Sequence, residues 1–176
     1  MMELSFVRTA GRHDRIYVRR SDGTETSWSF PGYGDELPHD LIHLVAESTF
    51  GVKDGFWSRV DAGAEVARIN EQANRTGGKD KYAGFGEDLS GLYMSEAVAN
   101  SLWGNHLPFE ERCEAISRAF AELGVAVSAD VIASKVQAAR TLIEDFREKW
   151  RLLAPKGTLR VSFDPRKPEA SFVSSS

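Results

Sequence analysis

Two of the four histidines in the chain, His39 and His43, stand four residues apart in the run Leu-Pro-His-Asp-Leu-Ile-His. On an α-helix, residues i and i+4 lie one above the other on a single face, and Glu47 continues that stripe one turn further. Two imidazoles and a carboxylate are a common ligand set for zinc or iron. The spacing therefore predicts a helix whose His39, His43 and Glu47 can hold a divalent metal ion.

Asp40 follows the first histidine, so the centre of the segment reads His-Asp-x-x-His. This pattern is similar to the His-Glu-x-x-His helix of zinc proteases, in which the glutamate is the general base. Aspartate is one methylene shorter, which reduces its reach toward a metal-bound water, so Asp40 is a weak catalytic candidate. A further metal ligand could come from His106, because it lies in a predicted turn between helices and turn residues can point into a cleft.

A helical projection of this segment puts Leu41 and Leu44 at the centre of the apolar face, and places His39, His43 and Glu47 nearly opposite. The two histidines are therefore not expected in an ordinary apolar core. Three interpretations stay open: a solvated helix face, a metal site that another part of the chain covers, and a metal-free acid–base or polar binding site.

The totals describe an ordinary globular protein. The chain has 176 residues, of which 41% are apolar and 27% are charged, and this length can bury a core without disulfides. A single cysteine, Cys113, excludes an internal disulfide and a cysteine-rich zinc site. The net charge of −4 argues against a nucleic-acid partner. No run of apolar residues predicts a signal peptide or a membrane segment, so we expect a cytoplasmic protein.

The predicted fold class is α+β: a small antiparallel N-terminal sheet, closed by a C-terminal strand, packed on a bundle of about five helices. Alternating apolar residues and an Asp-Gly turn predict three short strands before residue 31. The expected layout is 1–73 for the sheet and the His-Asp-x-x-His helix, 74–91 for a glycine-rich loop, 92–165 for a helical part and closing strand of the same domain, and 166–176 for a disordered tail.

The longest predicted helix, residues 129–153, carries apolar residues at alternating steps of four and three, a pattern that forms a continuous seam. This seam predicts either packing against other helices of the same chain or a homo-oligomer interface. Large aromatic residues in the seam favour the first alternative. The residues of the seam that a second copy would contact are Ile132, Val136, Ile143, Phe146 and Trp150.

The run from Leu37 to His43, followed by Glu47, Gly51 and Gly-Phe-Trp at residues 55–57, resembles a family of small bacterial proteins. In that family a short N-terminal sheet precedes a segment of the form His-Asp-Leu-x-His-x-x-x-Glu…Gly-Phe-Trp. The resemblance covers roughly residues 1–70 and implies a bacterial cytoplasmic protein. No activity is established for the family, so the resemblance implies no substrate, cofactor or catalytic residue.

Two functions follow as hypotheses. The first is a binding or interaction protein without catalysis, dimeric through the helix of residues 129–153. The second is a metal-dependent, hydrolase-like enzyme in which His39, His43 and either Glu47 or His106 bind the metal. The two differ in what the structure must contain. The first needs an exposed apolar seam along residues 132–153, and the second needs a concave, partly covered site around His39 and His43.

Overall fold

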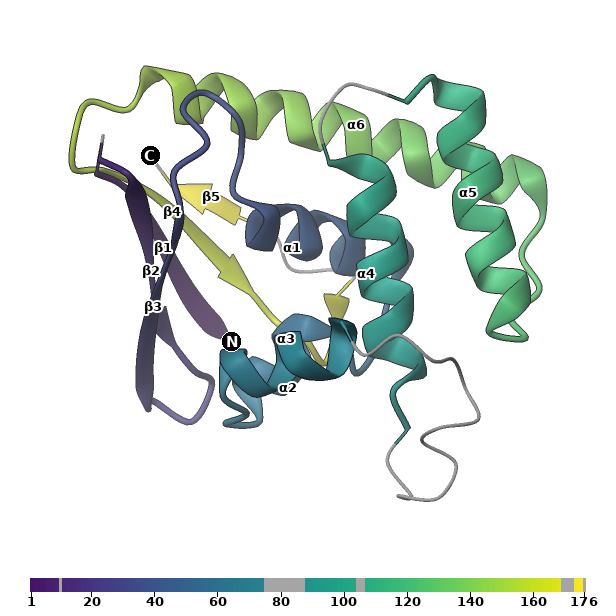
Figure 1. Cartoon of the computed structure of the whole chain (residues 1–176), viewed down its shortest axis with the longest axis horizontal. Coiled ribbons are helices and arrows are strands. Elements are labelled where there is room, and N and C mark those ends of the chain that lie inside the picture. The colour runs from purple at the N-terminus through teal and green to yellow at the C-terminus, as the bar shows by residue number, and fades with distance from the viewer. Residues whose placement is uncertain (10, 75–87, 104–106, 169–172, 176) are drawn as a thin grey trace.

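The computed structural model describes residues 1–9, 11–74, 88–103, 107–168 and 173–175. Within these residues a twisted antiparallel sheet stands beside a layer of helices, which is the predicted α+β class (Figure 1). Most of the predicted glycine-rich loop, 74–91, lies outside the described residues, and so does His106. None of the helices in the described part is both long and apolar enough to cross a membrane.

The sheet is built from strands far apart in the sequence. Strands β1 (Met2–Arg8), β2 (His13–Arg19) and β3 (Glu25–Pro31) form the predicted meander, and β4 (Gly157–Phe163) pairs antiparallel with β1. The strand order β3-β2-β1-β4-β5 makes the described sheet open rather than closed. The C-terminal strand therefore joins the sheet without closing it. Within residues 166–176, predicted as a disordered tail, the structure describes strand β5 (Val173–Ser175), paired with β4.

The inner face of the sheet follows from the alternation in its strands. Leu4 pairs with Val18 on one side and Val161 on the other, and all three side chains are buried. Because successive residues of a strand point to opposite faces, this register turns one apolar face of the sheet toward the helices.

Six helices are described on this side of the sheet: α1 (His39–Phe50), α2 (Phe56–Asp61), α3 (Val66–Asn74), α4 (Ser90–Leu102), α5 (Phe109–Glu122) and α6 (Ala129–Leu152). Helix α5 is farthest from the sheet and packs on α4 and α6 (Figure 1). Helix α1 lies between the sheet and α4, and it also contacts α6 and α2 (Figure 1). Its central position buries most of α1, including His43 and Glu47 of its polar stripe, while His39 stays partly exposed.

Helix α1 begins and ends where its sequence dictates. Pro38 has no N–H to leave unsatisfied and stands at the N-cap, and Gly51 ends the helix with a φ of 68°. This left-handed conformation favours glycine. The backbone N–H groups of Gly51 and Val52 both donate to the Glu47 carbonyl oxygen. The caps fix the rotation of the helix, and with it the direction of His39 and His43.

Helix α6 packs into the core of its own chain. The seam residues are at most 4% exposed and contact other core residues: Ile132, Val136, Ile143, Phe146 and Trp150. The seam is therefore inside the chain, as the intramolecular alternative predicts, and a second copy cannot contact these side chains without rearrangement. Homo-oligomerisation through α6 stays a prediction.

Candidate functional site

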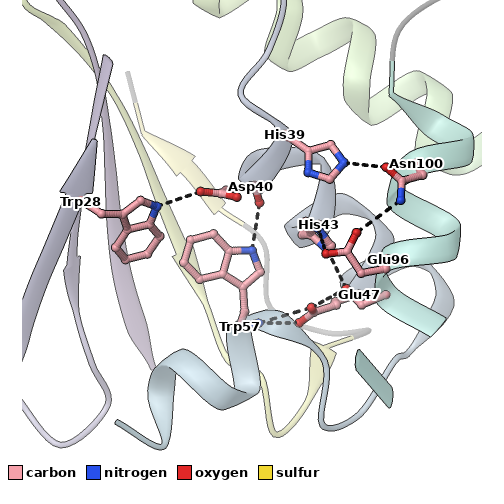
Figure 2. Close-up of polar contacts among 9 residues, drawn as sticks. Trp28, His39, Asp40, His43, Glu47, Trp57, Glu96 and Asn100 are labelled. Atoms are coloured by element: carbon pink, nitrogen blue, oxygen red, sulfur yellow. Dashed lines mark hydrogen bonds and ion pairs between the residues drawn. The ribbon is translucent and has the colours of Figure 1, made fainter. Parts of the chain in front are cut away.

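Helix α4 covers the polar stripe of α1. His43 is 1% exposed and Glu47 is fully buried, and both contact side chains of α4 (Figure 2). Of the alternatives that the sequence leaves open, a solvated helix face is wrong for these two residues. A buried histidine and a buried glutamate are costly unless they are hydrogen-bonded or paired. The side chains that pair with His43 and Glu47 therefore define the site.

Three potential metal ligands converge where α1 and α4 meet. One ligand atom each of His39, His43 and Glu96 lies within 4.8 Å of the others. His43 Nε2 is 3.3 Å from Glu96 Oε1, and the two imidazole rings stand edge to face with centroids 4.8 Å apart. Two imidazoles and one carboxylate gathered in this way match a ligand set for zinc or iron(II).

Asn100 holds two members of this cluster in place. Its Oδ1 is 3.2 Å from His39 Nε2, and its Nδ2 donates to Glu96 Oε2 at 3.3 Å (Figure 2). Because Oδ1 can only accept, His39 donates from Nε2, and a neutral His39 ring therefore carries its lone pair on Nδ1. Glu96 and Asn100 stand four residues apart on α4, in the same i, i+4 relation as the two histidines on α1.

On the far side of His43, a hydrogen-bonded chain fixes which nitrogen carries a proton. His43 Nδ1 is 2.8 Å from Ser95 Oγ, and Ser95 Oγ donates to Glu47 Oε1 at 2.7 Å. An ionised Glu47 can only accept, so the single hydroxyl proton of Ser95 goes to it; Ser95 then accepts from His43, and Nδ1 carries hydrogen. The lone pair of neutral His43 is then on Nε2, which faces Glu96. Metal-binding histidines are commonly oriented in this way by a partner behind the ring.

Glu47, which the sequence predicts as a ligand, lies behind His43 and outside the three-residue cluster. Its carboxylate also accepts from Trp57 N, 3.3 Å from each oxygen, at the start of α2. Gly55 makes this approach possible, since a Cβ at that position would lie 2.5 Å from Glu47 Oε1. The carboxylate is thus locked between α2 and Ser95.

The order of these groups excludes a serine-hydrolase triad. In such a triad the histidine lies between the serine and the acid and takes the serine proton. Here Ser95 lies between His43 and Glu47, donates its proton to the acid and is fully buried. Ser95 therefore positions His43 and is not placed to attack a substrate.

Asp40 lies on the side of α1 that faces the sheet. Trp28 Nε1 donates to Asp40 Oδ2 at 2.8 Å, and Trp57 Nε1 donates to the Asp40 carbonyl at 3.0 Å. Its carboxylate points toward Trp28 and away from Glu96 (Figure 2). Burial raises the pKa of Asp40, an effect that the Trp28 hydrogen bond and the two histidines partly offset. Whether Asp40 acts as a base stays a prediction.

A cleft of about 390 Å³ opens beside the cluster. This size is within the range of small-molecule sites. Trp28, Tyr33 and Trp103 supply aromatic walls, and polar groups include Asp40 and Asn70. The three clustered ligands also line it. The cleft is concave and partly covered, which is what the metal hypothesis needs around His39 and His43.

The charges of the three clustered residues are set by their surroundings. Burial lowers the pKa of His39, and the charge of His43 lowers it further, so the ring is neutral near pH ~7 and available as a ligand. For His43, burial acts downward, but the hydrogen bond and charge of Glu96 outweigh it and the pKa is raised. For Glu96, burial acts upward, but the same contact with His43 leaves the pKa lowered. The contact therefore favours a protonated His43 beside an ionised Glu96.

The pKa of Glu47 predicts how stability changes with pH. Burial raises it from 4.5 to about 7, so the folded chain holds a proton that the unfolded chain releases. Stability is then full below 4.5 and is lost as pH rises through about 7, by up to about 3 kcal/mol. We expect metal-free protein to unfold at less urea at about pH 8 than at about pH 5, and Glu47→Gln to show a smaller difference.

The comparison also involves the two histidines. His43, with a raised pKa, loses stabilisation as pH rises, whereas His39, with a lowered pKa, gains it. Because the charge of Glu47 raises the pKa of His43, the difference between the two profiles reports Glu47 together with its effect on His43. Parallel pH profiles for the two proteins would contradict the raised pKa of Glu47.

Comparison with protein-family models, curated proteins and solved structures gives no match for this chain. Sequence analysis missed Ser95, Glu96 and Asn100, although the i, i+4 pair Glu96–Asn100 was a signal of the same kind as His39–His43. His13 is exposed at the start of β2, far in sequence from the cluster, and Cys113 is half-buried on α5.

Proposed function

We propose that this protein binds a divalent transition-metal ion, zinc or iron(II), through His39, His43 and Glu96, and acts as a metal-dependent, hydrolase-like enzyme on a small molecule in the adjoining cleft. The observation that carries the proposal is the convergence of these three ligands at the cleft wall. Three protein ligands leave coordination positions for water or substrate, which is the arrangement of catalytic rather than structural sites.

The surroundings of the three ligands support the proposal. A neutral His39 and an ionised Glu96 are already in the state that binds a cation. On His43, Nδ1 is committed to Ser95, so Nε2 is the nitrogen that a metal would take after displacing the proton shared with Glu96. A bound metal ion would supply a Lewis acid and lower the pKa of a bound water.

The cleft provides the other groups that such a reaction needs. Asp40 lines it, and its raised pKa suits proton exchange at a higher pH than an ordinary aspartate allows. Trp28 fixes the carboxylate through its indole N–H. Tyr33 and Trp103, with ring centroids 5.2 Å apart, form a wall on which the apolar part of a substrate can pack.

Elemental analysis of the purified, untagged protein tests the proposal. We expect near-stoichiometric zinc or iron, or stoichiometric uptake of zinc after treatment with a chelator, and loss of both in His39→Ala/His43→Ala. His13→Ala is the matched control, because His13 is exposed on β2 and should leave metal content unchanged. A wild-type protein without metal that takes up none on titration would overturn the proposal.

The competing hypothesis of a pure interaction protein receives less support. It requires an exposed apolar seam on α6, and the five seam residues are buried in the chain's own core. If metal binding fails in the test above, the metal-free acid–base site is the alternative that the geometry favours, because His43 and Glu96, two titratable groups 3.3 Å apart, both line the cleft.

A further inference from the structure

A second cavity, of about 380 Å³, lies where the end of α4 meets the start of α5 and the C-terminal half of α6. Three arginines line it: Arg112 from α5, and Arg140 and Arg147 from α6. Phe109 and Ile143 add apolar surface. No residue lines both this cavity and the cleft beside His39 and His43, so the two sites can be tested separately.

The cavity carries more positive than negative charge. Arg147 donates from Nη1 to Glu144 at 2.6 Å and lies 3.5 Å from Glu36 through Nη2. Arg112 donates to the backbone carbonyls of Leu107 at 2.9 Å and Ser101 at 2.6 Å, which are neutral acceptors. Among the residues that line the cavity, three are arginines and one, Glu144, is acidic.

Two of the three arginines, Arg147 and Arg112, are buried. Arg147 is 4% exposed, and its Nε has no hydrogen-bond partner within the described residues. Burial lowers the pKa of Arg112, and the charges of Arg140 and Arg147 lower it further. Like charges held together away from water are costly unless an anion lies among them. An anion placed beside Arg112 and Arg147 would offset the mutual repulsion of these guanidinium groups.

We propose that this cavity binds the phosphate group of a small organic phosphate monoester, with Arg112, Arg140 and Arg147 around the phosphate and the apolar wall around the organic part. Planar guanidinium groups match phosphate oxygens, and a phosphate monoester carries nearly two negative charges near pH ~7. The cavity is much larger than inorganic phosphate alone. Phe109, over which the Arg140 guanidinium lies at 5.8 Å, offers a flat surface for the remainder of the ligand.

Isothermal titration calorimetry with phenyl phosphate, inorganic phosphate and benzoate tests this proposal on the full chain. We expect saturable one-to-one binding of phenyl phosphate, with inorganic phosphate and benzoate weaker. Arg140→Gln should weaken binding of phenyl phosphate about tenfold, because it removes one charge-assisted contact from an exposed side chain that the fold does not need. Arg118→Gln removes the same charge at an exposed position on α5 outside the cavity, and it should leave the affinity unchanged.

A second pair of variants tests the sign of the effect. Glu144→Gln removes a negative charge from the cavity wall and should tighten phenyl phosphate binding several-fold, whereas Glu148→Gln, exposed on α6 outside the cavity, should not. Absence of saturable binding to the wild type, or equal effects within either matched pair, would overturn the site. Equal affinity for inorganic phosphate and phenyl phosphate would overturn the organic part of the proposal.

Discussion

Glu47→Gln is expected to weaken zinc binding by about ten- to a hundredfold, although Glu47 is not one of the three proposed ligands. The carboxylate oxygen Oε1 accepts from Ser95, while both oxygens accept from Trp57 N. Glutamine is neutral, so the substitution removes the negative charge behind Ser95 that raises the pKa of His43. A less basic His43 is a weaker metal ligand.

Competition of each protein with a zinc-chelating dye measures this effect. Ser95→Ala breaks the same chain without changing charge, and it should also weaken binding, because His43 loses the partner that orients it. Glu114→Gln, an exposed substitution on α5, is the charge-matched control. Unchanged zinc affinity in both Glu47→Gln and Ser95→Ala would show that the chain behind His43 does not control the metal site.

The sequence was sufficient to predict α1 and the face it presents. Pro38 and Gly51 stand at the two ends of the observed helix, His39–Phe50. The i, i+4 spacing placed His39 and His43 on one face because that relation depends only on helix geometry. The three-strand meander and β4 were predictable for the same reason, since alternation along a strand is a local pattern.

The sequence was not sufficient to predict what covers that face. Ser95 and Glu96 come from a helix about fifty residues away in the chain, and the choice of neighbour depends on packing. The approach of α4 is unusually close at Gly91, where a Cβ would lie 2.1 Å from the Lys53 carbonyl oxygen. Such a fit is a property of two backbones together. No local pattern in either segment specifies it.

The same limit explains the changed position of Glu47. The helical projection correctly placed it in line with His39 and His43, but a shared stripe does not require a shared ligand. One turn beyond His43, the side chain meets the start of α2, where Gly55 leaves room for a carboxylate against the backbone. Glu96 then takes the third place in the cluster from α4. Glu47 thus supports the site from behind His43.

Gly55→Ala is expected to destabilise the protein by about 2–4 kcal/mol and to disturb the metal site with it. The φ of Gly55 is −77°, which any residue can adopt, so the cost is steric rather than conformational. The new Cβ would lie 2.5 Å from Glu47 Oε1 and 2.6 Å from its Cδ. Glu47 cannot move aside without leaving a buried carboxylate short of its hydrogen bonds, because Ser95 and Trp57 hold it.

Urea denaturation of the metal-free protein measures this cost, with Gly11→Ala as the matched control. A Cβ at Gly11 meets only Thr9 Oγ1 at 3.4 Å, an ordinary contact, so this variant should match the wild type within about 1 kcal/mol. A double-mutant cycle then identifies the cause. In a Glu47→Ala background the carboxylate is gone, and Gly55→Ala should cost little there. An equal cost of Gly55→Ala in both backgrounds would mean that contact with Glu47 is not what requires glycine at this position.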